Sequence, residues 1–216
     1  MTKAVKPRRA YDSPRRDEQA RATRRAILDA ARDLFIEHGY VAATLQAIGA
    51  RARTSPATVY AVFTNKRSIL SALVDVAIAG DDAPVPILDR PWVESMREEP
   101  DLRRRLATLA TNGRLILERR APIDEVVRAA AASDPEISAL YQQGKAQRLA
   151  GQRQLLRIVA GSHGLRAGLG EPSAVDILYA VGSSETYRLL TVDRGWSAAR
   201  FERWYADTLA RLLFEA

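Results

Sequence analysis

Apolar residues recur every three or four positions along almost the whole chain after residue 20. This spacing places them on one face of an α-helix, whereas the alternation that marks a half-buried strand is nearly absent. Proline and glycine separate the periodic stretches, and Ser, Thr, Asn or Asp precedes several of them as a helix cap. The pattern therefore predicts an all-α protein.

Four helices are expected in the N-terminal part, because each has a start or an end signal. They are 14–38 (Ser13 and Pro14 at its start, Gly39 after its end), 45–52 (Thr44 as cap), 56–63 (Ser55 as cap) and 66–79 (Asn65 as cap). Acidic residues and prolines interrupt the pattern between 80 and 91. This break predicts a boundary between a small N-terminal domain, 17–80, and a larger helical domain, 81–216.

Six further helices are expected in the larger domain. They are 92–98, three helices that begin near Pro100, Pro122 and Pro135, and two final helices at 173–190 and 197–214. Each of the three prolines is interpreted as a helix start, because proline cannot continue a preceding helix without losing a hydrogen bond. The helix from Pro135 is expected to reach residue 160, where a glycine-rich loop, 161–170, follows.

Positive charge is concentrated near the N-terminus. The formal net charge is +7, and residues 1–80 contain 14 of the 33 Lys and Arg but only 7 of the 26 Asp and Glu. Such a local surplus is typical of a site for nucleic acid, although a solvated basic tail would give the same count. Residues 1–16 hold six of these cations against one Asp, and we predict that they form a disordered basic arm.

Composition excludes several classes of chemistry. The chain has no Cys and two His, which argues against disulfides, thiolate zinc sites and cysteine-based catalysis. It shows no paired acid and base, nucleophile motif or phosphate-binding glycine loop, so we expect no enzyme activity, no catalytic residue, no cofactor and no metal site. It also lacks the roughly 18 uninterrupted apolar residues of a membrane span, and we expect a soluble, cytoplasmic protein associated with the nucleoid.

The two short helices, 45–52 and 56–63, have the proportions of a helix-turn-helix, whose second helix enters a DNA major groove. The exposed face of the second helix is small and uncharged. Methyl and hydroxyl groups on such a face suit close approach to base edges, including thymine methyl groups. The residues on this face are Pro56, Ala57, Thr58 and Ala61.

The stretch TLQAIGARARTSPATVYAVFTNKRSIL, 44–70, resembles the DNA-binding core of the TetR family of bacterial transcriptional repressors. The resemblance covers about residues 20–75 and is carried by the first Thr, Ile-x-x-x-Ala, the Ser before the second helix, Thr-x-Tyr-x-x-Phe and Asn-Lys. It implies a DNA-binding surface in which Ser55 caps the second helix. The implied phosphate contacts are Thr44, Tyr60 and Lys66, and the implied base or groove contacts are Gln46, Pro56, Ala57, Thr58 and Ala61.

Some of these residues have purely structural alternatives. Phe63 is interpreted as a core residue, whereas Tyr60 can pack its ring while its hydroxyl points outward. Lys66 lies at a helix start, which is electrostatically unfavourable unless an anion is near. Gln46 is either solvated or in contact with an adenine.

The turn between the two short helices departs from the family pattern. The family usually has Gly where this chain has Arg53. If the backbone there needs a positive φ, Arg53 carries strain of about 1 kcal/mol or more. The alternative gain is a phosphate contact by the Arg53 side chain.

The last two predicted helices have the pattern of an interface. The final helix has a wide apolar face, and the one before it contains small residues that permit close backbone approach. TetR-like proteins usually dimerise through such a pair, so we predict a homodimer, with packing inside one subunit as the alternative. The expected interface residues are Val181, Ser184, Phe201, Trp204, Tyr205, Thr208, Leu209 and Leu212.

Arg148 lies with Tyr141 on an otherwise apolar stripe of the helix 135–160. It is expected either to meet an anionic or carbonyl-bearing ligand or to pair with a carboxylate such as Glu118 or Asp124. Because the middle helices usually bound the pocket of TetR-like proteins, further candidates for contact with an unknown small-molecule effector are Trp92, Met96 and Arg114.

The sequence thus predicts a homodimeric, sequence-specific transcriptional regulator, in which an effector releases a repressor from a partly palindromic DNA operator. The alternative is an architectural nucleoid protein that binds DNA without an effector.

Overall fold

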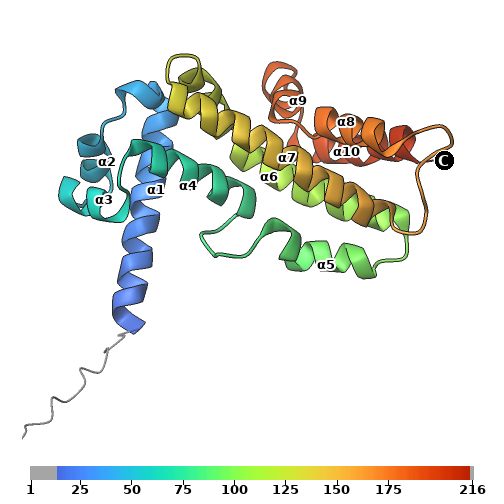
Figure 1. Cartoon of the computed structure of the whole chain (residues 1–216), viewed down its shortest axis with the longest axis horizontal. Coiled ribbons are helices and arrows are strands. Elements are labelled where there is room, and N and C mark those ends of the chain that lie inside the picture. Colours follow the sequence, from blue (N-terminus) through green and yellow to red (C-terminus); the bar gives the residue numbers. More distant parts are fainter. Residues whose placement is uncertain (1–13, 215–216) are drawn as a thin grey trace, which may run out of the picture.

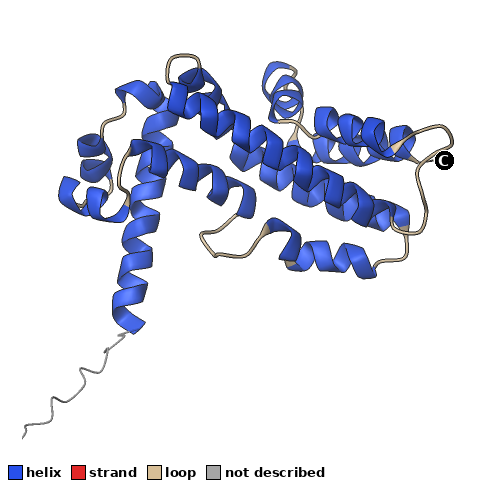
Figure 2. Cartoon of the chain, in the orientation of Figure 1, coloured by secondary structure: helices blue, strands red, loops and turns tan. Residues whose placement is uncertain are grey.

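The computed structural model describes residues 14–214, which fold into α-helices joined by loops and short turns (Figures 1 and 2). The predicted all-α fold is confirmed for this part of the chain. None of its helices combines the length and the apolar character needed to cross a bilayer. The elements are α1 (Pro14–Ala42), α2 (Leu45–Arg51), α3 (Pro56–Val62), α4 (Lys66–Ala79), η1 (Ile87–Asp89), α5 (Pro91–Glu98), α6 (Leu102–Ala131), α7 (Pro135–Ala160), α8 (Glu171–Val181), α9 (Ser184–Arg188), η2 (Leu189–Asp193) and α10 (Ala198–Leu213).

The predicted caps of α2 and α4 are confirmed, whereas Ser13, the predicted cap of the first helix, lies outside the described residues. Thr44 Oγ1 accepts from the Ala47 amide at 3.1 Å and opens α2, and Asn65 with Ser68 forms a reciprocal capping box at the start of α4. Gly39 has a φ of 79° and kinks α1 after His38, which is where the sequence predicts its end. These signals are readable because each depends on residues within one turn of the helix end.

The predicted start of a helix at Pro122 is wrong, because Pro122 lies inside the single helix α6. Its side chain is exposed, so water can solvate the carbonyl that loses its N–H partner, while buried residues on the opposite face hold the helix together. The predicted helix 173–190 is also wrong. It breaks at Gly182, which has a φ of −90° and a ψ of 35°, and Ser183 then caps α9.

The predicted basic arm, 1–16, lies mostly outside the described residues. Arg15 and Arg16, which the sequence places in that arm, belong to the first turn of α1 instead.

Two clusters of buried side chains form the core. One joins α1 to α4 with the adjoining ends of α6 and α7, and the other fills the space among α5 to α10. In Figure 1, α6 and α7 run side by side from the N-terminal helices to the opposite end of the molecule. The predicted division at residue 81 therefore separates two segments that share the first of these clusters, since Ile123, Val127 and Ile137 pack with the N-terminal helices.

Arginines from other elements close the carboxyl ends of several helices. Arg119 of α6 donates to the Ala77 carbonyl of α4 at 3.0 Å, and Arg166 donates to the Leu212 carbonyl of α10 at 2.8 Å. Buried Arg105 reaches carbonyls in the last turn of α7. A helix leaves its last four carbonyls unpaired and carries partial negative charge at that end, so a cation there is doubly favourable.

The α7 cap predicts a clear difference between two glycines. A Cβ at Gly161, φ 51°, would lie 1.9 Å from Nη1 of Arg105, whereas a Cβ at Gly164, φ 71°, meets no atom within 4 Å. We expect Gly164→Ala to lower the free energy of unfolding by about 1 kcal/mol through backbone strain alone. Gly161→Ala should cost about 1 to 2 kcal/mol more, because it also displaces the arginine. Denaturant unfolding of the two variants measures this difference, and equal losses would contradict the role of Arg105.

Candidate nucleic-acid interface

Helices α2 and α3 pack closely across a four-residue turn, 52–55, as in a helix-turn-helix. Gly49 makes the approach possible, because a Cβ there would lie 3.1 Å from the Thr54 carbonyl oxygen and 3.4 Å from Val59 Cγ2. Ile48 and Val59 are fully buried against α1 and fix the angle between the helices. Ser55 Oγ accepts from the Thr58 amide at 3.0 Å, which starts α3 as predicted. The outer face of α3 is therefore held rigidly toward solvent.

Most of the predicted DNA-binding residues share this exposed surface. Tyr60 is 58% exposed, and its hydroxyl has no hydrogen-bond partner within residues 14–214. Thr58 is half-buried, and its hydroxyl lies 2.8 Å from Ser55 Oγ. Phe63 is 3% exposed, as its interpretation as a core residue predicts. The exposed members of the predicted set are Thr44, Gln46, Arg53, Ser55, Pro56, Ala57, Tyr60 and Ala61.

The turn keeps the geometry that favours glycine even though it contains Arg53. This arginine has a φ of 55° and is the one non-glycine residue with a positive φ in the described chain. The Thr54 amide donates to the Gly49 carbonyl at 2.9 Å and closes the turn around it. The condition for backbone strain at Arg53 is thus met, while the exposed guanidinium remains free to meet an anion.

Lys66 has a different environment from the one that the sequence suggests. Its ammonium donates to the carbonyls of Tyr40 at 2.5 Å and Val41 at 3.1 Å, at the end of α1, and lies 4.4 Å from the centre of the Tyr40 ring. Burial lowers the pKa of Lys66. These acceptors compensate the cation at the start of α4, so no anion is needed to explain it. A phosphate contact by the third N–H of Lys66 stays a prediction.

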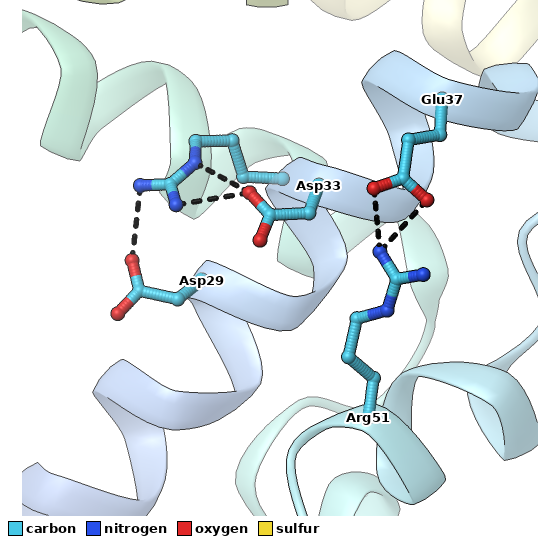
Figure 3. Close-up of polar contacts among 5 residues, drawn as sticks. Asp29, Asp33, Glu37 and Arg51 are labelled. Atoms are coloured by element: carbon cyan, nitrogen blue, oxygen red, sulfur yellow. Dashed lines mark hydrogen bonds and ion pairs between the residues drawn. The ribbon is translucent and has the colours of Figure 1, made fainter.

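Ion pairs on α1 were not anticipated from the sequence. Arg51 of α2 contacts both carboxylate oxygens of Glu37 at 2.8 Å, and Arg32 contacts Asp29 and Asp33 on the same helix (Figure 3). The hydrogen bond from Arg51 lowers the pKa of Glu37. Spacing of four residues places Asp29, Asp33 and Glu37 in one row. This acidic row is unsuited to a phosphate backbone and leaves the surface around α3 as the candidate DNA-binding face.

The comparison with protein families agrees with this geometry. Residues 27–73, from the buried part of α1 through most of α4, match the model described as bacterial regulatory proteins of the tetR family. Within this segment the chain is similar to the TetR family. Its match includes all of α2 and α3, and so nearly all of the candidate surface.

Individual relatives are similar to part of the chain. The curated protein YdeS of Bacillus subtilis strain 168, an uncharacterized HTH-type transcriptional regulator, is 41% identical over 71 residues. These residues cover 33% of this chain and 34% of YdeS, so the match spans about a third of each protein.

Similarity over most of the chain lies in the fold. SmeT, the repressor of the Stenotrophomonas maltophilia multidrug efflux pump SmeDEF, solved as a complex with triclosan, gives a TM-score of 0.67 at 23% identity over 90% of this chain and 92% of SmeT. FadR of Bacillus subtilis, solved with stearoyl-CoA, gives 0.66 at 18% identity over 86% and 96% of the two chains. Both likenesses concern the fold alone.

A cavity of about 1030 Å³ lies between α4, α6, α7 and the segment from α8 to η2. It adjoins the matched segment, 27–73, at α4. Tyr141 and Arg148 line it, as expected of an effector site. Arg148 pairs with neither Glu118 nor Asp124, because its guanidinium donates to backbone carbonyls instead.

The other predicted effector contacts lie elsewhere. Met96 is fully buried in the core under α5, and Trp92 packs against the same core. Arg114 binds Glu118 at 2.6 Å and Glu202 of α10 at 2.8 Å, because both carboxylates lie within reach of its guanidinium. None of the three lines the cavity. Effector contact by these three residues stays a prediction and is not supported by this cavity.

Part of the predicted dimer surface is buried inside one chain. Phe201 and Leu209 are 0% exposed and Tyr205 is 4% exposed. The Tyr205 side chain fills space left by two glycines, since a Cβ at Gly113 would lie 2.8 Å from its Cε1 and a Cβ at Gly182 would lie 2.5 Å from its hydroxyl oxygen. Burial raises the pKa of Tyr205 to about 12. The close approach that the small residues permit is thus made within the chain, and these three residues are not interface residues.

The remaining predicted interface residues divide in two. Ser184 is also buried and donates to Asp124 at 2.6 Å, so its assignment to the interface is wrong as well. Trp204, Thr208 and Leu212 recur every four residues along one stripe of α10; the first two are half-buried and Leu212 is 39% exposed. Val181, at the end of α8, is half-buried. Of the predicted interface residues, these four retain surface that a partner can reach.

Arg53 provides a test of the turn. We expect Arg53→Gly to raise the free energy of unfolding by about 0.5 to 1 kcal/mol, because relief of the positive φ exceeds the entropy that glycine gains in the unfolded chain. If the side chain contacts DNA phosphate, the same change weakens DNA binding. Arg53→Asn is the matched control, since Asn tolerates this φ but carries no charge. Denaturant unfolding and DNA titration separate the two effects, and a loss of stability in Arg53→Gly would contradict the strain.

Proposed function

We propose that this protein is a sequence-specific, DNA-binding transcriptional regulator that represses its target until a small-molecule effector releases it. The observation that carries the proposal is the exposed face of α3, held by a capped helix-turn-helix in a segment that matches the TetR family. The chain acts in the cytoplasm on the nucleoid and performs no catalysis.

Recognition depends on the small side chains of α3. Pro56, Ala57 and Ala61 allow the helix backbone to approach base edges in the major groove, and the Thr58 methyl group suits a thymine methyl. Thr44 and Tyr60 flank this face from solvent-exposed positions and supply phosphate contacts. Gln46 at the start of α2 adds a base or groove contact.

Dimerisation brings two copies of the helix-turn-helix to one operator. The homodimer surface consists of the stripe of α10 with Trp204, Thr208 and Leu212, and of the end of α8 with Val181. Two symmetric copies of α3 about 34 Å apart read successive major grooves on one face of DNA. The operator is therefore partly palindromic.

The cavity beside α4 is the effector site. SmeT and FadR, which share the fold, were solved with triclosan and stearoyl-CoA. In this chain Ser71, Val74 and Asp75 of α4 line the cavity, and α4 follows α3 after three residues. An effector that binds better when α4 is displaced shifts the two copies of α3 away from the spacing of DNA. Typical couplings of this kind are about 1 to 3 kcal/mol.

The function is tested by selecting genomic fragments with the purified protein and measuring affinity for the best fragment. We expect that fragment to bind roughly a thousandfold or more tightly than random duplex of equal length at the same salt concentration. Similar affinity for both would support an architectural nucleoid protein and contradict the proposed function.

Tyr60 and Lys66 test how the surface binds DNA. Tyr60→Phe should leave stability unchanged, because the hydroxyl has no partner in the described chain, and should weaken operator binding about five- to tenfold. Lys66→Ala should lower stability by about 1 kcal/mol through loss of the α1 carbonyl contacts. If Lys66 also contacts phosphate, that variant flattens the salt dependence of binding by about one unit.

Thermal unfolding and DNA titration at several salt concentrations measure both variants. Unchanged operator affinity in Tyr60→Phe contradicts the phosphate contact of Tyr60. An unchanged salt slope in Lys66→Ala assigns Lys66 to the structure of the domain alone.

A further inference from the structure

The cavity beside α4 contains charges of both signs, and half of these side chains are already in ion pairs with one another. Arg120 contacts Asp124 at 2.9 Å, Asp124 also accepts from Ser184, and Arg188 pairs with Glu125. These pairs satisfy one another across α6 and α9. They therefore form a polar wall and need no ligand for compensation.

Arg148 differs from the other cations of this wall. One terminal nitrogen donates to the carbonyls of Tyr179 at 2.5 Å and Gly182 at 3.0 Å, and the guanidinium stacks 3.9 Å from the centre of the Tyr179 ring. Its Nε and second terminal nitrogen have no hydrogen-bond partner within residues 14–214, and neither atom is fully buried. Three N–H groups thus remain available at the cavity wall.

The contacts with α8 explain where Arg148 lies, but they leave some of its N–H groups without an acceptor. Two bonds to carbonyls at the end of a helix stabilise a cation there, as Arg119 does at the end of α4. They use only one of the three guanidinium nitrogens, however. Burial lowers the pKa of Arg148, with Arg120 nearby as a further cause. An anion that accepts from Nε or Nη1 would compensate the buried cation further.

The space in front of Arg148 is open and partly apolar. A Cβ added at Gly144, one turn before Arg148 on α7, would meet no atom within 4 Å. Val74, Leu140, Tyr141 and Leu189 also line the cavity and supply apolar surface for a hydrocarbon or aromatic body. The site therefore combines N–H donors of Arg148, held in a fixed position, with room for an uncharged body.

The balance of charge distinguishes between anions. The cavity is lined by five basic side chains and five acidic ones, the latter including Asp75 and Asp124. A dianionic phosphate monoester would be repelled by the acidic set, whereas a carboxylate carries a single charge and can accept a charge-assisted hydrogen bond from Nη1 or Nε of Arg148.

We propose that the cavity binds an organic acid, whose carboxylate accepts from a free N–H group of Arg148 and whose uncharged body occupies the space at Gly144. This assignment rests on the proposed effector site and specifies its ligand class. Tyr179 and the carbonyl contacts fix the orientation of the guanidinium before the ligand arrives.

The test measures binding of paired probes to the full chain without DNA. The probes are octanoate, 3-phenylpropionate and 1-naphthoate, each compared with its primary amide and with a phosphate monoester, phenyl phosphate. We expect at least one acid to bind ten times or more tightly than its own amide and than phenyl phosphate, measured by calorimetry and thermal shift. No preference for any acid over its amide, or tighter binding of phenyl phosphate, would overturn the proposal.

Variants localise the binding. Arg148→Met should abolish the preference for the acid over its amide. Because this change also removes contacts with α8, Gly144→Leu provides a second test: it fills the cavity in open space and should abolish binding of acid and amide alike. Gly151→Leu is the matched control, since Gly151 lies two turns further along α7, meets no atom within 4 Å and does not line the cavity. Equal binding by both leucine variants would contradict the site.

The outcomes separate this inference from the proposed function. Acid binding that requires Arg148 in a chain without operator preference would support the ligand site and refute the proposed regulator. Operator preference without acid binding would do the reverse. If both hold, addition of the acid should weaken operator binding by a factor of about 5 to 150 in the wild-type protein and leave Gly144→Leu unaffected.

Discussion

Cationic side chains that close the carboxyl ends of helices recur throughout this fold. Each reaches from another part of the chain, so one contact both neutralises the end of a helix and joins two elements. Hydrogen bonds of this charged kind are worth about 1.5 to 3 kcal/mol, more than most exposed ion pairs. The five cations and the helices they close are Lys66 at α1, Arg119 at α4, Arg105 at α7, Arg148 at α8 and Arg166 at α10.

This pattern changes the meaning of the positive charge in the sequence. The surplus in residues 1–80 indicates a polyanion site, and the exposed surface around α3 is consistent with it. Yet several cations of that segment are bound to protein groups: Lys66 to carbonyls, Arg24 to Asp82, and Arg67 to Glu136. A count of charges cannot separate these from free ones, because the acceptors lie 15 or more residues away.

Sequence reasoning succeeded where structure depends on neighbouring residues. The caps of α2, α3 and α4, the kink at Gly39 and the exposed face of α3 all follow from short motifs. It failed where distant residues decide. The burial of Tyr205 depends on space left at Gly113 and Gly182, which no periodicity reveals. Likewise, α6 continues through Pro122 because the buried residues before and after it pack into the two core clusters, and this packing outweighs one lost hydrogen bond.

The N-terminal helices share a core cluster with the end of α6 and the start of α7. This shared cluster limits how the N-terminal helices can be exchanged between related proteins. Ile69 and Leu70 of α4 are fully buried in the cluster that includes Ile123 and Ile137. A chimaera joined within the loop 80–91 would pack the N-terminal helices of one protein against the α6 end and α7 start of another. Exchange of the proposed DNA specificity between relatives therefore requires transplanting these parts of α6 and α7 as well, or confining the exchange to the solvent-facing side chains of α3.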